Sequence, residues 1–226
     1  AVQKAVAERW MQLTNTFITE AYGLTETSPG ACANPPGVAW SGKIGLPLPS
    51  TDISIRDEQF NPLPPWGGTD DVEQHTGEIC VRGPQVMQGY WNQPAETADV
   101  MRDGWLRTGD VGHMDSDGYV TITDRQKDMI VVSGFKVYPS EIESIVAAIP
   151  GVLECGVVGV PDAKTGEAVK VVIVKRDPAL TEDAVIASCR AQLTAYKVPR
   201  IVEFRDTLPK SAIGKVLRRE LRAAAS

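Results

Sequence analysis

The sequence has few residues that could bind zinc or form disulfides. Its four cysteines (Cys32, Cys80, Cys155 and Cys189) are far apart, form no C-x-x-C pair and are accompanied by only two histidines. This scarcity excludes a disulfide scaffold, predicts no zinc site and favours buried thiols in a reducing cytoplasm. No apolar run approaches the ~20 residues that a spanning helix needs, so no transmembrane segment is predicted.

Extremes of composition and charge are absent as well. Hydrophobic residues make up 42% and charged residues 23% of the 226 positions, which excludes disordered and collagen-like classes. The net charge of −6 argues against a nucleic-acid-binding protein. Residues 197–226 nevertheless carry eight Lys or Arg against three Asp or Glu, a net charge of +5. This basic end predicts local binding of an anion such as a phosphate, and a solvated basic helix is the alternative.

The first half of the chain reads as a helix followed by short strands. Apolar spacing predicts a helix over 2–13, a strand over 16–19 and a Gly- and Pro-rich loop over 28–51. Alternating patterns between turn residues then predict a small antiparallel β subdomain, with strands over 52–56, 77–82 and 118–123.

After Asp124 the pattern changes to α-β-β-α-β-α. Helices are predicted over 139–149, 181–194 (with Thr181 as N-cap) and 214–224, and strands over 152–160, 168–175 and 198–204. The fold class is therefore α+β, with a boundary near residues 124–128. We expect domains over 1–127 and 128–226.

Two motifs in the first half could bind a nucleotide. In Tyr22-Gly23-Leu24-Thr25-Glu26, the hydroxyl of Thr25 could donate to a phosphate, the carboxylate of Glu26 suits Mg²⁺, and the nearby ring of Tyr22 could stack on a purine. An ordinary polar turn is the alternative. Asp110, expected to follow a glycine turn, could accept hydrogen bonds from ribose hydroxyls. A turn aspartate that caps its own loop is equally compatible with the sequence.

Two further motifs lie at and beyond the boundary. Arg125 offers a rigid fork of donors to sugar or phosphate oxygens, and Gly134 lets a ligand approach the backbone. A charged interdomain linker explains the same residues. Lys215 follows Gly214 on a loop that opens the last predicted helix, where its charge could reach a phosphate. The spacing of a Walker loop is absent, and a solvated lysine is the alternative.

Taken in order, four segments resemble the adenylate-forming superfamily, which includes acyl-CoA synthetases, firefly luciferase and peptide-synthetase adenylation domains. The segments are Tyr22–Thr27 (YGLTET), Asp103–Lys127 (DGWLRTGDVGHMDSDGYVTITDRQK), Met129–Glu143 (MIVVSGFKVYPSEIE) and Pro209–Leu221 (PKSAIGKVLRREL). The likeness covers essentially the whole chain, and in detail it resembles bacterial long-chain fatty acid–CoA ligases. It implies that the chain is the end of a large adenylate-forming domain followed by a compact, mobile C-terminal domain.

The resemblance implies a two-step reaction with ATP, Mg²⁺ and coenzyme A. A fatty acid carboxylate attacks the α-phosphate of ATP, and the thiol of coenzyme A then displaces AMP from the acyl-adenylate. By position, Tyr22 would stack on adenine, Thr25 would contact phosphate and Glu26 would hold Mg²⁺. The ribose hydroxyls would be bound by Asp110 and Arg125.

Three residues near or in the second domain take their implied roles from the same likeness. Lys215 would stabilise charge in the first step. Lys127 occupies the hinge position, about which the small domain would turn. Gly134 would then line a channel for the pantetheine arm of coenzyme A.

One family feature is missing from this sequence. The Thr/Ser/Gly-rich loop for the β- and γ-phosphates is not found, and the chain begins at Ala1 rather than Met. We therefore expect a C-terminal piece of a longer ligase, inactive without its N-terminal part, whose partners are fatty acid, ATP and coenzyme A. A cytoplasmic location is expected, and peripheral contact with the inner face of the cell membrane and homodimer formation are left open.

Two alternatives remain at this point. One is another acyl- or aryl-activating ligase of the same superfamily, because the specificity pocket lies upstream. The other is a non-catalytic module that binds a nucleotide or coenzyme A. We also expect residues 128–226 to fold independently and residues 1–51 to be the less stable part, since Trp10, Leu13, Phe17 and Ile18 would normally pack on missing partners.

Overall fold

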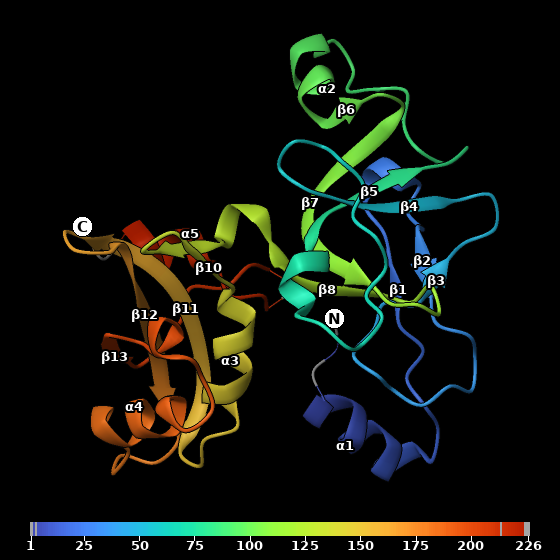
Figure 1. Ribbon diagram of the computed structural model, residues 1–226. Helices are drawn as coiled ribbons and strands as arrows, with labels where there is room; N and C mark the ends of the chain where they lie inside the picture. The colour runs from blue at the N-terminus through green and yellow to red at the C-terminus, as the bar shows by residue number, and fades with distance from the viewer. Residues whose placement is uncertain (1, 3, 213, 224–226) are drawn as a thin grey trace. The chain divides into compact units, whose positions relative to one another are not determined.

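The chain divides into two compact units, Ala1–Gln126 and Lys127–Ser226 (Figure 1). The computed structural model describes residues 2, 4–212 and 214–223. Each unit combines helices with mainly antiparallel sheet, which confirms the α+β class. None of the helices within these described ranges is both long and apolar enough to cross a membrane.

The first unit begins with one helix and a small sheet. The helix α1 (Lys4–Thr14) is followed by three two-residue strands, β1 (Ala21–Tyr22), β2 (Cys32–Ala33) and β3 (Leu46–Pro47), paired antiparallel in that order. The short helix η1 (Thr25–Thr27) lies between β1 and β2. The strand predicted over 16–19 is wrong, because no described strand pairs with this segment. Gln3, within the predicted first helix, lies outside the described residues.

A five-stranded antiparallel sheet forms the body of the first unit. Its strands are β4 (Asp52–Arg56), β5 (Gly77–Arg82), β6 (Met101–Arg102), β7 (Trp105–Met114) and β8 (Val120–Arg125), in the order β4-β5-β7-β6 with β8 also paired to β7. Between them lie η2 (Val72–His75) and α2 (Pro94–Val100). The patterns predicted β4 and β5 to the residue and β8 within two residues, but not β7.

The second unit is built on a second five-stranded sheet. The chain enters it through η3 (Gln126–Asp128). Its strands are β9 (Ile130–Val132), β10 (Phe135–Val137), β11 (Val152–Asp162), β12 (Gly166–Lys175) and β13 (Ile201–Arg205), in the order β10-β9-β12-β11, with β13 parallel to β12. Its helices are α3 (Pro139–Ala147), α4 (Glu182–Arg190), η4 (Ala195–Lys197) and α5 (Arg218–Ala223).

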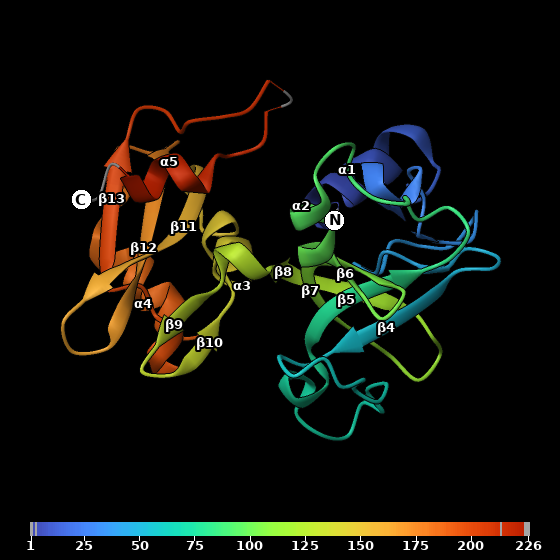
Figure 2. The same ribbon diagram turned by 90° about the horizontal axis from the view of Figure 1, so that it is seen from above.

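Both faces of β11 and β12 are buried, which explains their nearly continuous apolar sequences. Val157 and Val171 belong to the cluster that includes residues of α3 and α4. Their neighbours Val158 and Val172 belong to a second cluster with Leu221 of α5. The helices α3 and α4 therefore cover one face, and α5 packs beside β11 on the other (Figure 2).

The ends of α4 and α5 can be compared with the ends predicted from the sequence. Thr181 caps α4 as predicted, because its hydroxyl accepts from the backbone N–H of Ala184 at 3.3 Å. The last helix begins at Arg218 and not at Gly214, because Lys210 and Val216 pair first in a β-bridge. Ala224, its expected end, lies outside the described residues.

Candidate active site

Three of the predicted nucleotide-binding residues meet in the first unit. The hydroxyl of Tyr22 donates to Oδ2 of Asp110 at 2.7 Å, and Nε of Arg125 lies 3.4 Å from Oδ1 of the same carboxylate. Asp110 and Arg125 face each other across the β7–β8 ladder. The aspartate is buried and the arginine is exposed. Since each carboxylate oxygen can accept more than one hydrogen bond, Asp110 retains acceptor capacity for a ligand.

A β-bulge sets the direction of Asp110. The pairing of β5 with β7 shifts between Glu78 and Cys80, where Gly109 takes a φ of +71°. The hydroxyl of Thr108 donates to the carbonyl of Ile79 at 2.7 Å and accepts from the N–H of Asp110 at 3.1 Å. A bulge re-aims the side chain next to it, so the expected glycine turn before Asp110 is instead an irregularity within a strand.

Burial raises the pKa of Tyr22, and the nearby carboxylate of Asp110 raises this pKa further. The phenol therefore stays protonated and acts as the donor in its bond to Asp110. The same side chain packs against the hydrophobic cluster around Ile55 and Ile79. Tyr22 is half-buried, so it connects this core to the surface beside Asp110.

Glu26 is held in place by residues that the sequence analysis missed. Its Oε1 accepts from the hydroxyl of Tyr90 at 2.7 Å, and its carbonyl accepts from the N–H of Met87 at 2.8 Å. Thr25, in the same short helix, is exposed. The turn before it requires glycine at position 23, because a Cβ there would lie 1.5 Å from the carbonyl oxygen of Pro29.

The donor set around Glu26 suits magnesium. Mg²⁺ prefers hard oxygen ligands and is usually held by one or two carboxylates together with substrate phosphates and water. Glu26 offers a half-buried carboxylate in which only Oε1 is bound by Tyr90. No group of three or more His, Cys, Asp or Glu side chains is arranged for a metal within the part of the chain that the structure describes. A magnesium ion here would therefore need ligands from ATP.

Lys127 and Gly134 lie at the start of the second unit. Lys127 is exposed in η3. Gly134 occupies the two-residue turn between β9 and β10, where φ is +53° at Ser133 and +86° at Gly134. Positive φ at both positions is typical of a tight hairpin turn and favours glycine. A Cβ at Gly134 would meet nothing within 4 Å, so the turn alone explains the residue and the space beside it is open.

Lys215 is exposed on a closed loop of the second unit. The loop is fastened where the N–H of Leu217 donates to the carbonyl of Pro209 at 2.9 Å. The N–H of Ser211 donates to the carbonyl of Lys215 at 2.8 Å. Among the described residues, no carboxylate forms an ion pair with the Lys215 ammonium. These hydrogen bonds constrain the backbone at Lys215, while its ammonium group stays available to bind an anion.

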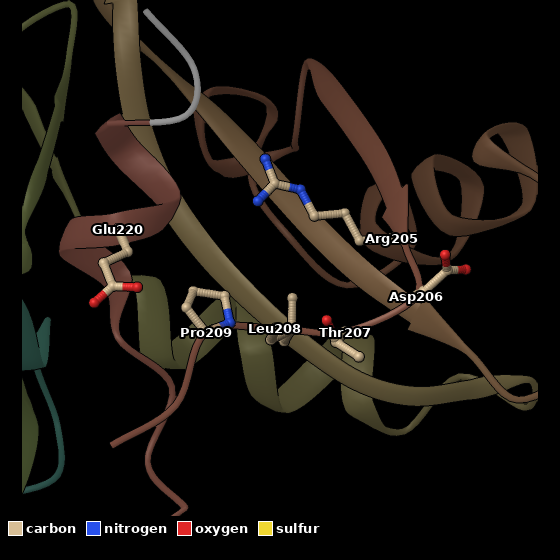
Figure 3. Close-up of a pocket in the computed structure, with 6 residues that line it drawn as sticks. All are labelled: Arg205, Asp206, Thr207, Leu208, Pro209 and Glu220. Atoms are coloured by element: carbon tan, nitrogen blue, oxygen red, sulfur yellow. The ribbon is translucent and has the colours of Figure 1, made fainter. Parts of the chain in front are cut away.

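A shallow hollow of about 570 Å³ lies at the base of this loop (Figure 3). Figure 3 shows Glu220 of α5 on one side and Arg205 and Asp206 on the other. Arg205 is already paired with Glu203. None of the predicted site residues lines this hollow, and its mixed charges do not favour a phosphate.

The predicted site residues fall into two groups. In the first unit Asp110 contacts both Tyr22 and Arg125, and the same unit contains Thr25 and Glu26. The second unit contains the other three, Lys127, Gly134 and Lys215.

Comparisons with known proteins identify the class of protein. The family profile described as AMP-binding enzyme matches residues 1–91. The profile described as AMP-binding enzyme C-terminal domain matches residues 141–215, and together they cover more than half of the chain. The chain therefore belongs to the AMP-binding, adenylate-forming enzymes.

Three relatives illustrate the likeness. The long-chain-fatty-acid–CoA ligase of Yersinia pestis is 56% identical over 98% of this chain and 38% of its own length. ATP-bound MatB from Rhodopseudomonas palustris is 38% identical, with a TM-score of 0.88 over 97% of this chain and 43% of that protein. The o-succinylbenzoate CoA synthetase MenE of Bacillus subtilis, in complex with its acyl-adenylate intermediate, is 30% identical, with a TM-score of 0.84 over 97% and 44%. The chain thus spans less than half the length of each of these relatives.

Proposed function

We propose that this chain is part of an AMP-forming ligase that joins a long-chain fatty acid to coenzyme A. The proposal rests on the 56% identity with the long-chain-fatty-acid–CoA ligase of Yersinia pestis over 98% of the chain. Fatty acid, ATP and coenzyme A are the substrates, and acyl-CoA, AMP and pyrophosphate are the products.

In the first step, the fatty acid carboxylate attacks the α-phosphorus of ATP and pyrophosphate leaves. Tyr22 stacks on adenine, while Asp110 and Arg125 bind the ribose hydroxyls. Their direct contacts support this assignment, because a preformed cluster orients the nucleotide at little entropic cost. Thr25 contacts phosphate. Mg²⁺ bound at Glu26 would supply positive charge beside the phosphates.

Lys215 stabilises the negative charge that develops on the transferred phosphate. Phosphoryl and nucleotidyl transfers depend mainly on positioning and on charge stabilisation, which a lysine provides without covalent chemistry. The exposed side chain and constrained backbone of Lys215 suit a group that must enter a site for one step and leave it for another.

In the second step, the thiol of coenzyme A attacks the acyl carbon and AMP leaves. We propose that residues 128–226 form a mobile domain that turns about Lys127, while residues 1–127 end the large domain. Rotation of this domain would remove Lys215 from the active site and bring a channel beside Gly134 to it, through which the pantetheine arm of coenzyme A would enter. The division of the chain into compact units between Gln126 and Lys127 supports a hinge at this point.

The chain by itself should be inactive. It spans 38% of the length of the Yersinia pestis ligase, and its sequence has no Thr/Ser/Gly-rich phosphate loop. Fatty-acid-dependent ATP–pyrophosphate exchange by the purified 226-residue chain would contradict this expectation.

The substitution Lys215→Ala in the intact enzyme tests the reaction. We expect a loss of ATP–pyrophosphate exchange of about 10²-fold or more, because a charge-stabilising donor is removed. Thioester formation from supplied acyl-adenylate should continue. Lys164→Ala, at another exposed lysine of the second unit, is the control. Survival of both steps, or loss of both, would show that the role proposed for Lys215 is wrong. Absence of both steps in the unsubstituted intact protein would indicate a non-catalytic binding module.

Another acid could take the place of the fatty acid. MenE, which is 30% identical, is a synthetase for o-succinylbenzoate, an aryl acid. A panel of long-chain, medium-chain and aryl acids given to the intact enzyme would decide between them. A preference for aryl acids would overturn the fatty acid assignment but not the adenylate chemistry.

We also propose a cytoplasmic enzyme that makes peripheral contact with the inner face of the membrane, where fatty acids partition. Flotation of the intact enzyme with lipid vesicles tests this contact, and sedimentation equilibrium tests for a homodimer. An enzyme that remains with the soluble fraction would contradict the membrane contact, and sedimentation as a monomer would exclude the homodimer.

A further inference from the structure

Two arginines one turn apart on α5 bind the start of the second unit. The Nη1 and Nη2 groups of Arg222 donate to the carbonyls of Lys127 and Asp128, each at 3.1 Å. These residues end η3, and carbonyls at the end of a helical turn lack N–H donors within the turn. A guanidinium is well suited to such carbonyls, since its planar donors can bind two oxygens at once.

Arg218 binds the side chain of the same segment. Its Nη1 lies 3.0 Å from Oδ2 of Asp128. Its Nε and Nη2 bind the two carboxylate oxygens of Glu143 at 3.0 and 2.6 Å. Glu143 also accepts from the N–H of Val157 in β11 at 2.9 Å, so the contact reaches the central sheet. The Arg218 side chain is only 15% exposed, which makes this an internal ion-pair network.

The same helix is continuous with the loop that contains Lys215. The loop closes at Leu217, directly before Arg218, and Leu221 is fully buried in the second hydrophobic cluster. Figure 2 shows this loop leading into α5. A short helix fixed to the core therefore contacts the entry segment on one side and supports Lys215 on the other.

We propose that Arg218 and Arg222 are positioning residues that define the pivot between the two units. Arg222 holds the carbonyls of Lys127 and Asp128 on α5, and Arg218 holds the Asp128 carboxylate, so rotation takes place before Asp128. The entry segment and the Lys215 loop then move as one body. The attachment of the entry segment to α5 rests on contacts within the second unit alone. Only the effect of this attachment on catalysis rests on the proposed function.

Amide hydrogen exchange of the 226-residue chain tests the pivot. In Arg222→Gln, we expect amides of residues 127–130 to exchange roughly tenfold faster, because the two carbonyl contacts are lost and local opening becomes easier. Amides of β11 and β12 should keep their protection. Arg219→Gln is the matched control, since Arg219 is an exposed arginine on the same helix. Unchanged exchange at 127–130 would overturn the proposal.

A general loss of stability must be distinguished from a loosened pivot. If Arg222→Gln raises exchange equally throughout the second unit, Arg222→Lys decides. A lysine keeps the charge but cannot bind both carbonyls at the same geometry. Faster amide exchange confined to residues 127–130 in this variant supports the pivot. Amide exchange at the wild-type rate in these residues overturns it.

The catalytic consequence is measured in the intact enzyme. Arg222→Gln should lower kcat for both half-reactions and leave KM for ATP unchanged, because the proposed adenine and ribose contacts of Tyr22, Asp110 and Arg125 lie in the first unit. Arg219→Gln should retain both kcat values. If the wild-type enzyme shows no ATP–pyrophosphate exchange, the proposed function fails. The amide hydrogen exchange result for the pivot still stands. A change confined to KM would contradict the positioning role.

Discussion

At the scale of single residues, the two histidines of this chain have opposite environments. The Nδ1 of His75 lies 2.8 Å from the carbonyl of Pro64, and its Nε2 lies 2.8 Å from the carboxylate of Asp70. Both partners are acceptors, so both nitrogens can donate only in the protonated ring. These hydrogen bonds, with that to Pro64 the largest cause, raise the pKa of His75. Burial lowers the pKa of His113.

The two histidines should therefore titrate on opposite sides of the ordinary value of about 6.5. Because the folded-state pKa of His75 is raised, its contribution to stability is complete below about pH 6.5 and is lost as pH rises through the folded pKa. NMR titration of the two imidazole C–H signals measures both values, and His75→Gln assigns them. Two titrations at the same unperturbed pH would contradict the contacts of the 64–75 loop.

At the scale of the element, the bulge in β7 leads to a prediction about the stability of variants at Gly109. Gly109 has a φ of +71°, and a Cβ there would meet nothing within 4 Å. Gly109→Ala should therefore cost about 1–2 kcal/mol of unfolding free energy, from backbone strain alone. Gly109→Asn should recover part of this loss, because asparagine tolerates positive φ. Urea denaturation measures the difference.

Gly112, three residues further along β7, provides the comparison. A Cβ there would lie 2.1 Å from the carbonyl oxygen of Thr121, so its glycine is required by a close approach of two strands. Gly112→Ala should destabilise the protein more than Gly109→Ala, and Gly112→Asn should give no recovery. Equal recovery by asparagine at both positions would show that φ does not decide the effect at Gly109.

The same element shows where prediction from the sequence ends. Alternation located β4 and β5 because each is a regular strand between turn residues. It missed β7 because Gly109 and Gly112 interrupt the apolar pattern, although Asp103 and Gly104 form a turn directly before Trp105. Only the pairing of β7 with β5 and β8 makes its irregular backbone a strand.

The candidate site shows the same limit. Motif order predicts Tyr22, Asp110 and Arg125 as site residues, and in the structure Asp110 contacts both of the others. It did not reveal Tyr90, whose hydrogen bond to Glu26 spans 64 residues of sequence. The sequence around a tyrosine in a loop does not indicate such a contact, because the tertiary structure determines which residue lies beside it.

At the scale of the whole molecule, the two units differ in how completely they bury apolar surface. The second unit buries side chains on both faces of its sheet. The first unit leaves Val6, Trp10 and Leu13 of α1 exposed, at spacings that place them on one helix face, and Phe17 is exposed just beyond it. A face of this kind is normally covered, and most of the length of the Yersinia pestis relative lies outside the matched region.

We therefore expect residues 127–226 to fold when expressed alone, with a free energy of unfolding on the order of 5–15 kcal/mol. In the 226-residue chain, amides of β11 and β12 should exchange far more slowly than those of residues 4–51, because their opening requires exposure of both hydrophobic clusters. The isolated second unit should reproduce the protection of β11 and β12 seen in the longer chain. Equal protection across both units, or an isolated second unit without protected amides, would mean that its stability depends on the first unit. The hinge segment would then be part of a shared core, and a rotation of one unit against the other would require that core to open.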